Sequence, residues 1–158
     1  MTRRGIVIVT STRAANGEYE DRTGPAIAAW LADHGFTVDS GVVVPDGPEV
    51  AGAIAIALDS SPALVITTGG TGVGHGDGTP DATAAVLDKQ LPGFSEELRR
   101  RGAAATPLSL LSRGVAGVAG STLIVNLPGS IGGVRDGLQL LGEVVDHLLD
   151  QIAGVDHG

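Results

Sequence analysis

The sequence predicts a single α/β domain, built as a three-layer α/β/α sandwich around a mostly parallel sheet. Short β-branched runs alternate along the chain with longer segments of helical periodicity, which is typical of parallel strands joined by crossover helices. The length of 158 residues suits one domain, and a hydrophobic content of 42% is sufficient for a substantial core. No linker, repeat or low-complexity tract divides residues 1–158, so we expect one unit.

The first half of the chain is predicted to contain three strands and two helices. The strands are the apolar runs at residues 6–10, 37–44 and 64–67. The first helix covers residues 24–34, with Pro25 near its start and Gly35 where a glycine commonly ends a helix. The second helix, residues 48–58, is apolar over most of its surface, so we expect it to be well buried.

The second half is predicted to contain three helices and one strand. The helices cover residues 79–88, 93–101 and 131–153, and the strand covers residues 121–127. Thr79 is the expected N-cap of the first of these helices, with Pro80 at the first helical position. Residues 102–120 are less regular, and we expect from them no more than a short edge strand.

Composition excludes several classes of function. A formal net charge of −8 and an aromatic content of 3% argue against a nucleic-acid partner. With no cysteine, the chain has no disulfide, thiol nucleophile or cysteine-ligated zinc, and we expect a cytoplasmic location. No apolar stretch approaches the roughly 20 residues that a membrane span needs, so we expect no membrane partner.

A glycine-rich loop follows the strand at residues 64–67 and is the most informative feature of the chain. Its glycines are Gly69, Gly70, Gly72, Gly74 and Gly76. Glycines let main-chain N–H groups approach a ligand closely, and N–H groups beside a helix N-terminus favour an anion. Ligands of open α/β sheets bind at the carboxyl ends of the strands. The loop is therefore predicted to hold a phosphate.

Asp77 lies between two glycines of this loop, where its carboxylate would repel a phosphate unless a cation separated them. Magnesium is usually held by one or two carboxylates together with substrate phosphates, so the pattern indicates a Mg-nucleotide site. Asp46 follows the second strand and is expected at the same edge of the sheet. The alternatives are a long surface turn in which Asp77 only bonds its neighbours, and a turn or N-cap role for Asp46.

Other phosphate-binding motifs are missing. The sequence contains no GxxxxGK[ST] motif, which excludes a P-loop, and the alternating glycines do not match the GxGxxG spacing of a Rossmann dinucleotide site. Phosphate groups would then be bound by arginine side chains, by main-chain N–H groups or by a metal ion. Arg13 and Arg113 could reach the same sheet edge, although ordinary solvated arginines are the alternative for both.

Several short motifs, in this order, give the chain a family resemblance. They are NGxxxD at residues 16–21, PD at 45–46, TTGGTG at 67–72, TPDAT at 79–83 after Asp77, PGF at 92–94 with Glu97, SR at 112–113 and NLPGS at 126–130. Together they resemble the molybdopterin adenylyltransferase (MogA/MoaB) family of molybdenum cofactor biosynthesis. The resemblance implies a homotrimeric α/β/α enzyme that transfers AMP from Mg-ATP to the terminal phosphate of molybdopterin, with a molybdenum-insertion enzyme as a downstream partner.

The resemblance also implies roles for individual residues. Asp46 and Asp77 match the two functional aspartates of the family and are the expected catalytic residues, with Asp77 also the expected Mg²⁺ ligand. The expected ligand-binding residues are Thr68, Gly69, Gly70, Thr71, Gly72, Asp81, Ser112, Asn126, Pro128, Gly129 and Ser130. The family often has Ser-Asp-Arg where this chain has Ser11, Thr12 and Arg13.

Two alternatives to this enzyme stay open at the level of sequence. A family fold can be retained after activity is lost, which would leave a non-catalytic molybdopterin-binding or scaffold protein. The domain could also bind another phosphorylated metabolite. For Asp81, an acidic residue in the first turn of a helix that complements the helix dipole is the alternative to ligand binding.

Overall fold

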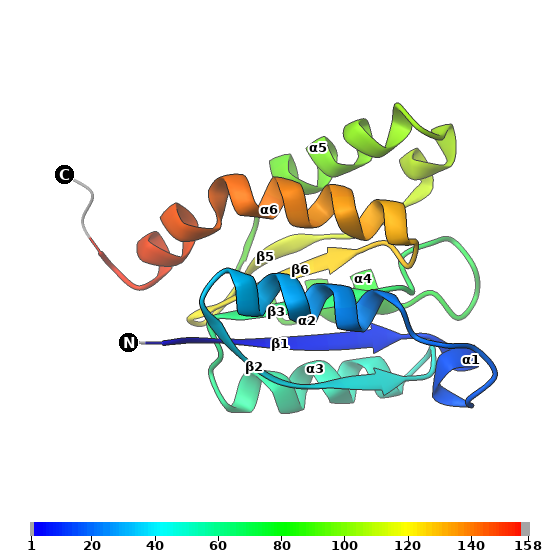
Figure 1. Ribbon diagram of the computed structural model, residues 1–158, viewed down its shortest axis with the longest axis horizontal. Helices are drawn as coiled ribbons and strands as arrows, with labels where there is room; N and C mark the ends of the chain where they lie inside the picture. Colours follow the sequence, from blue (N-terminus) through cyan, green and yellow to red (C-terminus); the bar gives the residue numbers. More distant parts are fainter. Residues whose placement is uncertain (1, 156–158) are drawn as a thin grey trace.

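The computed structural model describes residues 2–155, and within this range six strands form one sheet in the order β2-β1-β3-β6-β5-β4 (Figure 1). The strands are β1 (Arg3–Thr10), β2 (Phe36–Val44), β3 (Leu64–Thr68), β4 (Lys89–Gln90), β5 (Ala116–Ala119) and β6 (Thr122–Leu127). Strands β2, β1, β3 and β6 are parallel, whereas β5 and β4 are antiparallel to their neighbours. The predicted mostly parallel sheet is confirmed.

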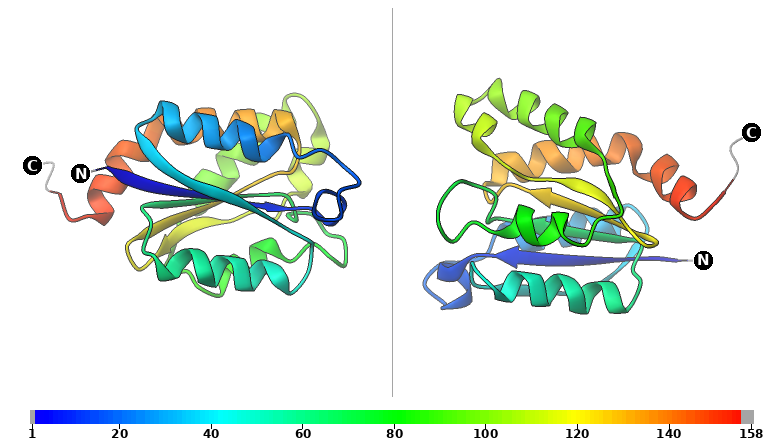
Figure 2. Two further views of the ribbon diagram at one scale, coloured as in Figure 1. Left: turned by 60° about the horizontal axis from the view of Figure 1, so that its bottom comes forward. Right: turned by 180° about the vertical axis from the view of Figure 1, so that it is seen from behind.

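Helices cover both faces of the sheet and complete three layers (Figure 2). One face carries α2 (Thr23–Asp33), α5 (Pro92–Ala103) and α6 (Ile131–Ile152), and the other carries α3 (Glu49–Asp59) and α4 (Thr79–Ala84). Two short helices, α1 (Thr12–Ala15) and the 3₁₀ helix η1 (Pro107–Leu111), lie in the connections. The α/β/α sandwich expected from the sequence is confirmed.

Strand β1 shows how the sequence builds these layers. Val7 and Val9 pack into the cluster beneath α2 and α6, while Ile6 and Ile8 pack beneath α3. Successive side chains of a strand point to opposite faces, so a strand covered on both faces is apolar at every position. This explains why the central strands appear in the sequence as unbroken β-branched runs.

The connections after β1 and β3 leave the sheet toward opposite faces. Strand β1 leads to α2 on one face, and the adjacent β3 leads through the glycine loop to α4 on the other. Two neighbouring parallel strands with this arrangement leave a crevice at their carboxyl ends, called the topological switch point. In Figure 1 this is the edge to which the arrowheads of β1 and β2 point.

The helix predicted at residues 79–88 is shorter than expected. It ends at Ala84, because the Asp88 N–H donates to the Val118 carbonyl at 2.8 Å and the chain turns into strand β4. The N-cap is Gly78, so the expectation that Thr79 caps the helix is wrong. The Thr79 N–H donates instead to the Gly70 carbonyl at 3.2 Å, which places Thr79 inside the first turn beneath the loop.

Helix α3 is less buried than its composition suggested. Val50, Ile54 and Ala57 pack on the sheet, but Ile56 is 75% exposed in the single chain. The expectation of a well-buried second helix is therefore wrong for its outer face. Among residues 2–155, no helix has both the length and the hydropathy required to cross a bilayer.

Gly137 tests the packing of α6 on β6. A Cβ at Gly137 would overlap the Leu127 side chain, whereas a Cβ at Gly142 on the same helix would meet its nearest atoms at 3.8 Å. We expect Gly137→Ala to lower the free energy of unfolding by about 1–3 kcal/mol through overpacking. Gly142→Ala should raise it by about 0.5–1 kcal/mol, because alanine favours the helix. Urea denaturation measures both, and equal effects would contradict this packing.

Candidate functional site

The glycine loop begins where main chain packs directly against main chain. Gly69 and Gly70 have φ angles of +91° and +67°. A Cβ at Gly69 would overlap the carbonyl oxygen of Thr10, and a Cβ at Gly129 would lie 3.4 Å from the Gly69 Cα. Only glycine adopts these φ angles at low cost and also permits such close contact. The ends of β1, β3 and β6 are thereby held together.

These strand ends enclose a cavity of about 400 Å³, which we call the switch-point cavity. Of the residues expected from sequence, it is lined by Asp46, Thr68, Gly69, Gly70, Asp77, Gly129 and Ser130. The structure thus places both expected catalytic aspartates at one cavity, although they come from the ends of β2 and of the glycine loop. The carboxyl edge of a parallel sheet accounts for this convergence.

Both aspartates are held by neighbours. One carboxylate oxygen of Asp77 accepts the Gly74 N–H at 3.0 Å, so the turn-forming role considered for Asp77 is real. Asp46 is not an N-cap, since Pro48 occupies that position. Its carboxylate accepts the Thr12 hydroxyl at 3.2 Å, and its own N–H donates to that hydroxyl at 3.0 Å. Thr12 therefore orients Asp46.

Sequence reasoning missed several residues of this cavity. The segment after β1 contributes Ser11, Tyr19, Asp21 and Arg22. The Asp21 carboxylate accepts the Gly24 N–H in the first turn of α2 at 3.0 Å. The available signal was position, since this segment directly follows the carboxyl end of a central strand. Arg13 does not line the cavity; its guanidinium lies 5.3 Å from the centre of the Tyr19 ring.

Two helix N-termini face the switch-point cavity and favour an anion. Thr23 is the first residue of α2, Ile131 is the first residue of the 22-residue α6, and both line the cavity. The Ser130 hydroxyl caps α6 by accepting the Gly133 N–H at 3.1 Å. The partial positive charges of the helix ends, together with Arg22, favour an anion in the cavity, although the Asp21 carboxylate also lies at the N-terminus of α2.

The donor set of this cavity fits magnesium bound with a phosphorylated ligand. Two carboxylates combined with phosphate oxygens are the ligands that Mg²⁺ usually takes. The loop glycines let the Asp77 carboxylate pack closely against the main chain, because a Cβ at Gly72 or Gly74 would lie 2.9 Å from that carboxylate. In the described part of the chain, no three His, Cys, Asp or Glu side chains are grouped to hold a metal ion.

A second cavity, of about 420 Å³, adjoins the first at Ser130, and we call it the η1 cavity. The sequence-predicted residues that line it are Thr71, Gly72, Ser112, Pro128 and Ser130. Leu108 and Leu111 of η1 form part of its wall. The two cavities therefore share Ser130, and the glycine loop contributes residues to both.

Asn126 and Asp81 lie outside both cavities. Asn126 is 3% exposed; its amide donates to the hydroxyls of Thr67 at 2.9 Å and Thr83 at 3.0 Å, and its oxygen accepts the Val115 N–H at 3.1 Å. These bonds join β6 to β3, to α4 and to the segment before β5. The Asp81 side chain is 72% exposed and pairs with Arg113 at 3.2 Å.

Glu97, which belongs to the sequence pattern, forms ion pairs within helix α5. Its carboxylate accepts hydrogen bonds from Arg100 and Arg101 at 2.6 and 2.9 Å, and Arg101 also bonds Glu143 on α6 at 2.7 Å. The hydrogen bonds from Arg100 and Arg101 hold the pKa of Glu97 at about 2. Arg101 thus links α5 to α6, and Glu97 does not line the switch-point cavity.

The fold and site together define a class: a doubly wound α/β domain with a cavity at its topological switch point, the place where such domains commonly bind ligands. Residues 6–147 match the family model described as "Probable molybdopterin binding domain". The chain belongs to this family of molybdenum cofactor biosynthesis proteins, which confirms the resemblance found in the sequence.

Relatives of known name agree with this assignment. The molybdenum cofactor biosynthesis bifunctional protein of Synechococcus elongatus is 38% identical over 96% of this chain and 48% of its own length. The chain thus spans about half of that relative. The molybdopterin adenylyltransferase of Escherichia coli K12 is 35% identical over 92% of this chain and 78% of its own. The solved Mog protein of Mycobacterium ulcerans is 53% identical with a TM-score of 0.92, covering 96% and 99% of the two chains.

Gly69→Ala tests the main-chain contact that begins the loop. We expect this variant to lose about 1–3 kcal/mol of unfolding free energy, because a positive φ and a backbone overlap both oppose a side chain. Gly78→Ala is the matched control, since a Cβ at Gly78 meets nothing within 4 Å, and it should change stability by less than about 1 kcal/mol. Chemical denaturation of both variants provides the comparison; a stable Gly69→Ala protein would refute the contact.

Proposed function

We propose that the protein is a molybdopterin adenylyltransferase, which transfers AMP from Mg-ATP to the terminal phosphate of molybdopterin. One observation carries this proposal: two cavities share a rim at Ser130 and the glycine loop, and one of them contains both Asp46 and Asp77. A transfer between two bulky anionic substrates needs two such spaces that meet at one point. The family membership and the name of the Escherichia coli relative support the same reaction.

In the proposed reaction, a phosphate oxygen of molybdopterin attacks the α-phosphorus of ATP. The bond from that phosphorus to the bridging oxygen breaks, and pyrophosphate leaves with the electron pair. No protein nucleophile is required, so the protein acts by positioning and by balancing charge. This chemistry suits a site made of glycines, aspartates and helix N-termini.

Different residues of the chain would bind the metal ion and the phosphate groups. Asp77 would hold the magnesium ion with help from Asp46, and the ion, when bound, neutralises charge on the phosphate oxygens. The Gly69 N–H is already bonded to the Leu127 carbonyl at 3.1 Å. We therefore assign the anion contacts to the amides of Gly70, Thr71 and Gly72, together with the N-terminus of α6.

Asp77→Asn is the central test. With molybdopterin and Mg-ATP, we expect release of pyrophosphate to fall on the order of 10²-fold or more, because a neutral amide neither holds the metal nor balances its charge. Asp46→Asn should cause a smaller loss. Asp33→Asn, an exposed residue at the end of α2, makes the same change of charge away from the site and should keep full activity.

Two results would redirect the assignment. Tight binding of molybdopterin without release of pyrophosphate by the unaltered protein would indicate a non-catalytic binding or scaffold protein. If neither ATP nor molybdopterin competes for the site but another phosphorylated compound does, the ligand is a different metabolite. Activity of Asp77→Asn equal to that of Asp33→Asn would remove the proposed role of Asp77.

We further propose that residues 1–158 form one molybdopterin-binding domain that assembles as a homotrimer in the cytoplasm, where Mg-ATP is supplied, and passes its product to a molybdenum-insertion enzyme. The ends of this range, residue 1 and residues 156–158, lie outside the described residues. An apolar groove between β2 and α3 supports assembly: Ile56 and Val42 are 75% and 44% exposed there. Contacts between subunits would remove this surface from water.

Light scattering tests the assembly. We expect a mass three times that of the 15.8 kDa chain. Ile56→Glu should reduce that mass, because a carboxylate would be buried without a partner. A monomer of the unaltered protein at micromolar concentration would contradict the trimer and would leave the proposed reaction untouched.

A further inference from the structure

Arg113 directs its guanidinium at the glycine loop. It lies in the connection from η1 to β5, and its Nε donates to the Gly72 carbonyl at 2.8 Å. One terminal nitrogen donates to the Asp77 carbonyl at 2.5 Å, and the other contacts the Asp81 carboxylate at 3.2 Å. The Arg113 N–H also donates to the Thr71 carbonyl at 2.8 Å. One residue thus holds both ends of the loop segment that leads to Asp77.

The bonds within the loop are local. The Asp77 N–H donates to the Gly74 carbonyl at 3.0 Å, and the Gly74 N–H returns a bond to the Asp77 carboxylate at 3.0 Å. Such bonds shape the turn but do not attach it to the rest of the domain. A glycine-rich segment also loses more conformational entropy on ordering than other sequences. The long-range bonds from Arg113 supply the missing attachment.

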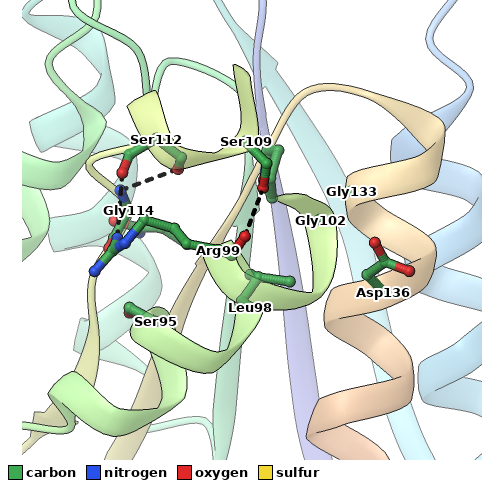
Figure 3. A pocket seen from close by; sticks show the side chains of 11 residues that line it. Ser95, Leu98, Arg99, Gly102, Ser109, Ser112, Gly114, Gly133 and Asp136 are labelled. Carbon is green, nitrogen blue, oxygen red and sulfur yellow. Dashed lines mark hydrogen bonds between the residues drawn. The ribbon is translucent and has the colours of Figure 1, made fainter. Parts of the chain in front are cut away.

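A second arginine holds the backbone on either side of Arg113. The Arg99 guanidinium, which extends from α5, donates to the carbonyls of Ser112 and Gly114 at 3.2 Å each (Figure 3). The Ser109 hydroxyl in turn donates to the Arg99 carbonyl at 3.1 Å. Helix α5 and η1 are thereby connected, through Arg99 and then Arg113, to the loop that carries Asp77.

We propose that Arg113 is a positioning residue of the site, which fixes the main chain at Asp77 so that its carboxylate stays at the switch-point cavity, with Arg99 supporting it. The guanidinium is planar, and its donors diverge, so it can bond two carbonyls and a carboxylate at once; the ammonium of lysine is a point charge without this fork. Because its Nε and one terminal nitrogen are directed at main-chain carbonyls of the loop, we assign Arg113 to positioning of the loop and not to phosphate binding. The test of this proposal by enzyme kinetics rests on the proposed function, whereas its test by amide hydrogen exchange does not.

Amide hydrogen exchange of the ligand-free protein tests the attachment directly. We expect exchange in peptides spanning residues 70–78 to accelerate about ten-fold or more in Arg113→Met and in Arg113→Lys, because neither side chain can replace the charged hydrogen bonds. Arg99→Met should accelerate the same peptides less. Arg135→Met, which removes an exposed arginine of α6, is the matched control and should leave them unchanged.

Steady-state kinetics separates positioning from phosphate binding. Misplacement of Asp77 should lower kcat on the order of 10²-fold in both Arg113 variants, and any rise in the KM for ATP that follows from loosening of the loop should be equal in the two. Arg113→Lys should not restore kcat. A raised KM for ATP in Arg113→Met that Arg113→Lys rescues, with loop exchange unchanged, would overturn the proposal and make Arg113 a phosphate ligand.

The two proposals fail in different ways. If the unaltered protein releases no pyrophosphate, the proposed function fails, yet the exchange rates still decide whether Arg113 fixes the loop. If Arg113→Met does not fold, as thermal melting would reveal, Arg113→Lys and Arg99→Met decide the matter. Unchanged exchange at residues 70–78 in both of these variants would overturn the positioning role.

Discussion

The direct packing of the Gly69 main chain against the end of β1 is the contact on which the rest of the site depends. Strands β1 and β3 are neighbours, and their connections leave toward opposite faces of the sheet, so their ends must meet without side chains between them. Gly129 brings the end of β6 into the same contact. The ends of three strands are therefore held together beside the switch-point cavity.

The charges of the site follow from this geometry. The carboxyl edge of the sheet collects Asp46 and Asp77, which alone would repel phosphate. The N-termini of α2 and α6 lie at the same edge: α6 begins shortly after the end of β6, and α2 follows β1 after a connection that contains α1. The fold thus places helix N-termini and carboxylates around one cavity, an arrangement that suits a phosphate bound together with a divalent cation.

Arginine has an unusual role in this domain. Arg113 and Arg99 donate mainly to main-chain carbonyls, in segments with little regular secondary structure. A glycine loop needs freedom from side chains to approach a ligand, and the same freedom makes it costly to order. Charged hydrogen bonds from a neighbouring segment reconcile the two requirements, since they hold the loop without occupying the cavity.

The sequence by itself determined the fold class, the glycine loop and the edge at which Asp46 and Asp77 would meet, because these follow from local periodicity and from the direction of parallel strands. It also carried the motifs of the family. Only the tertiary structure decided the antiparallel β4, the partial exposure of α3 and the separate surroundings of Asn126, Asp81 and Arg113. These features depend on contacts between residues far apart in the chain: the Asn126 amide bonds Thr67, and Arg113 bonds Gly72. A local pattern cannot reveal such pairings, since the same asparagine or arginine could equally have faced a ligand or the solvent.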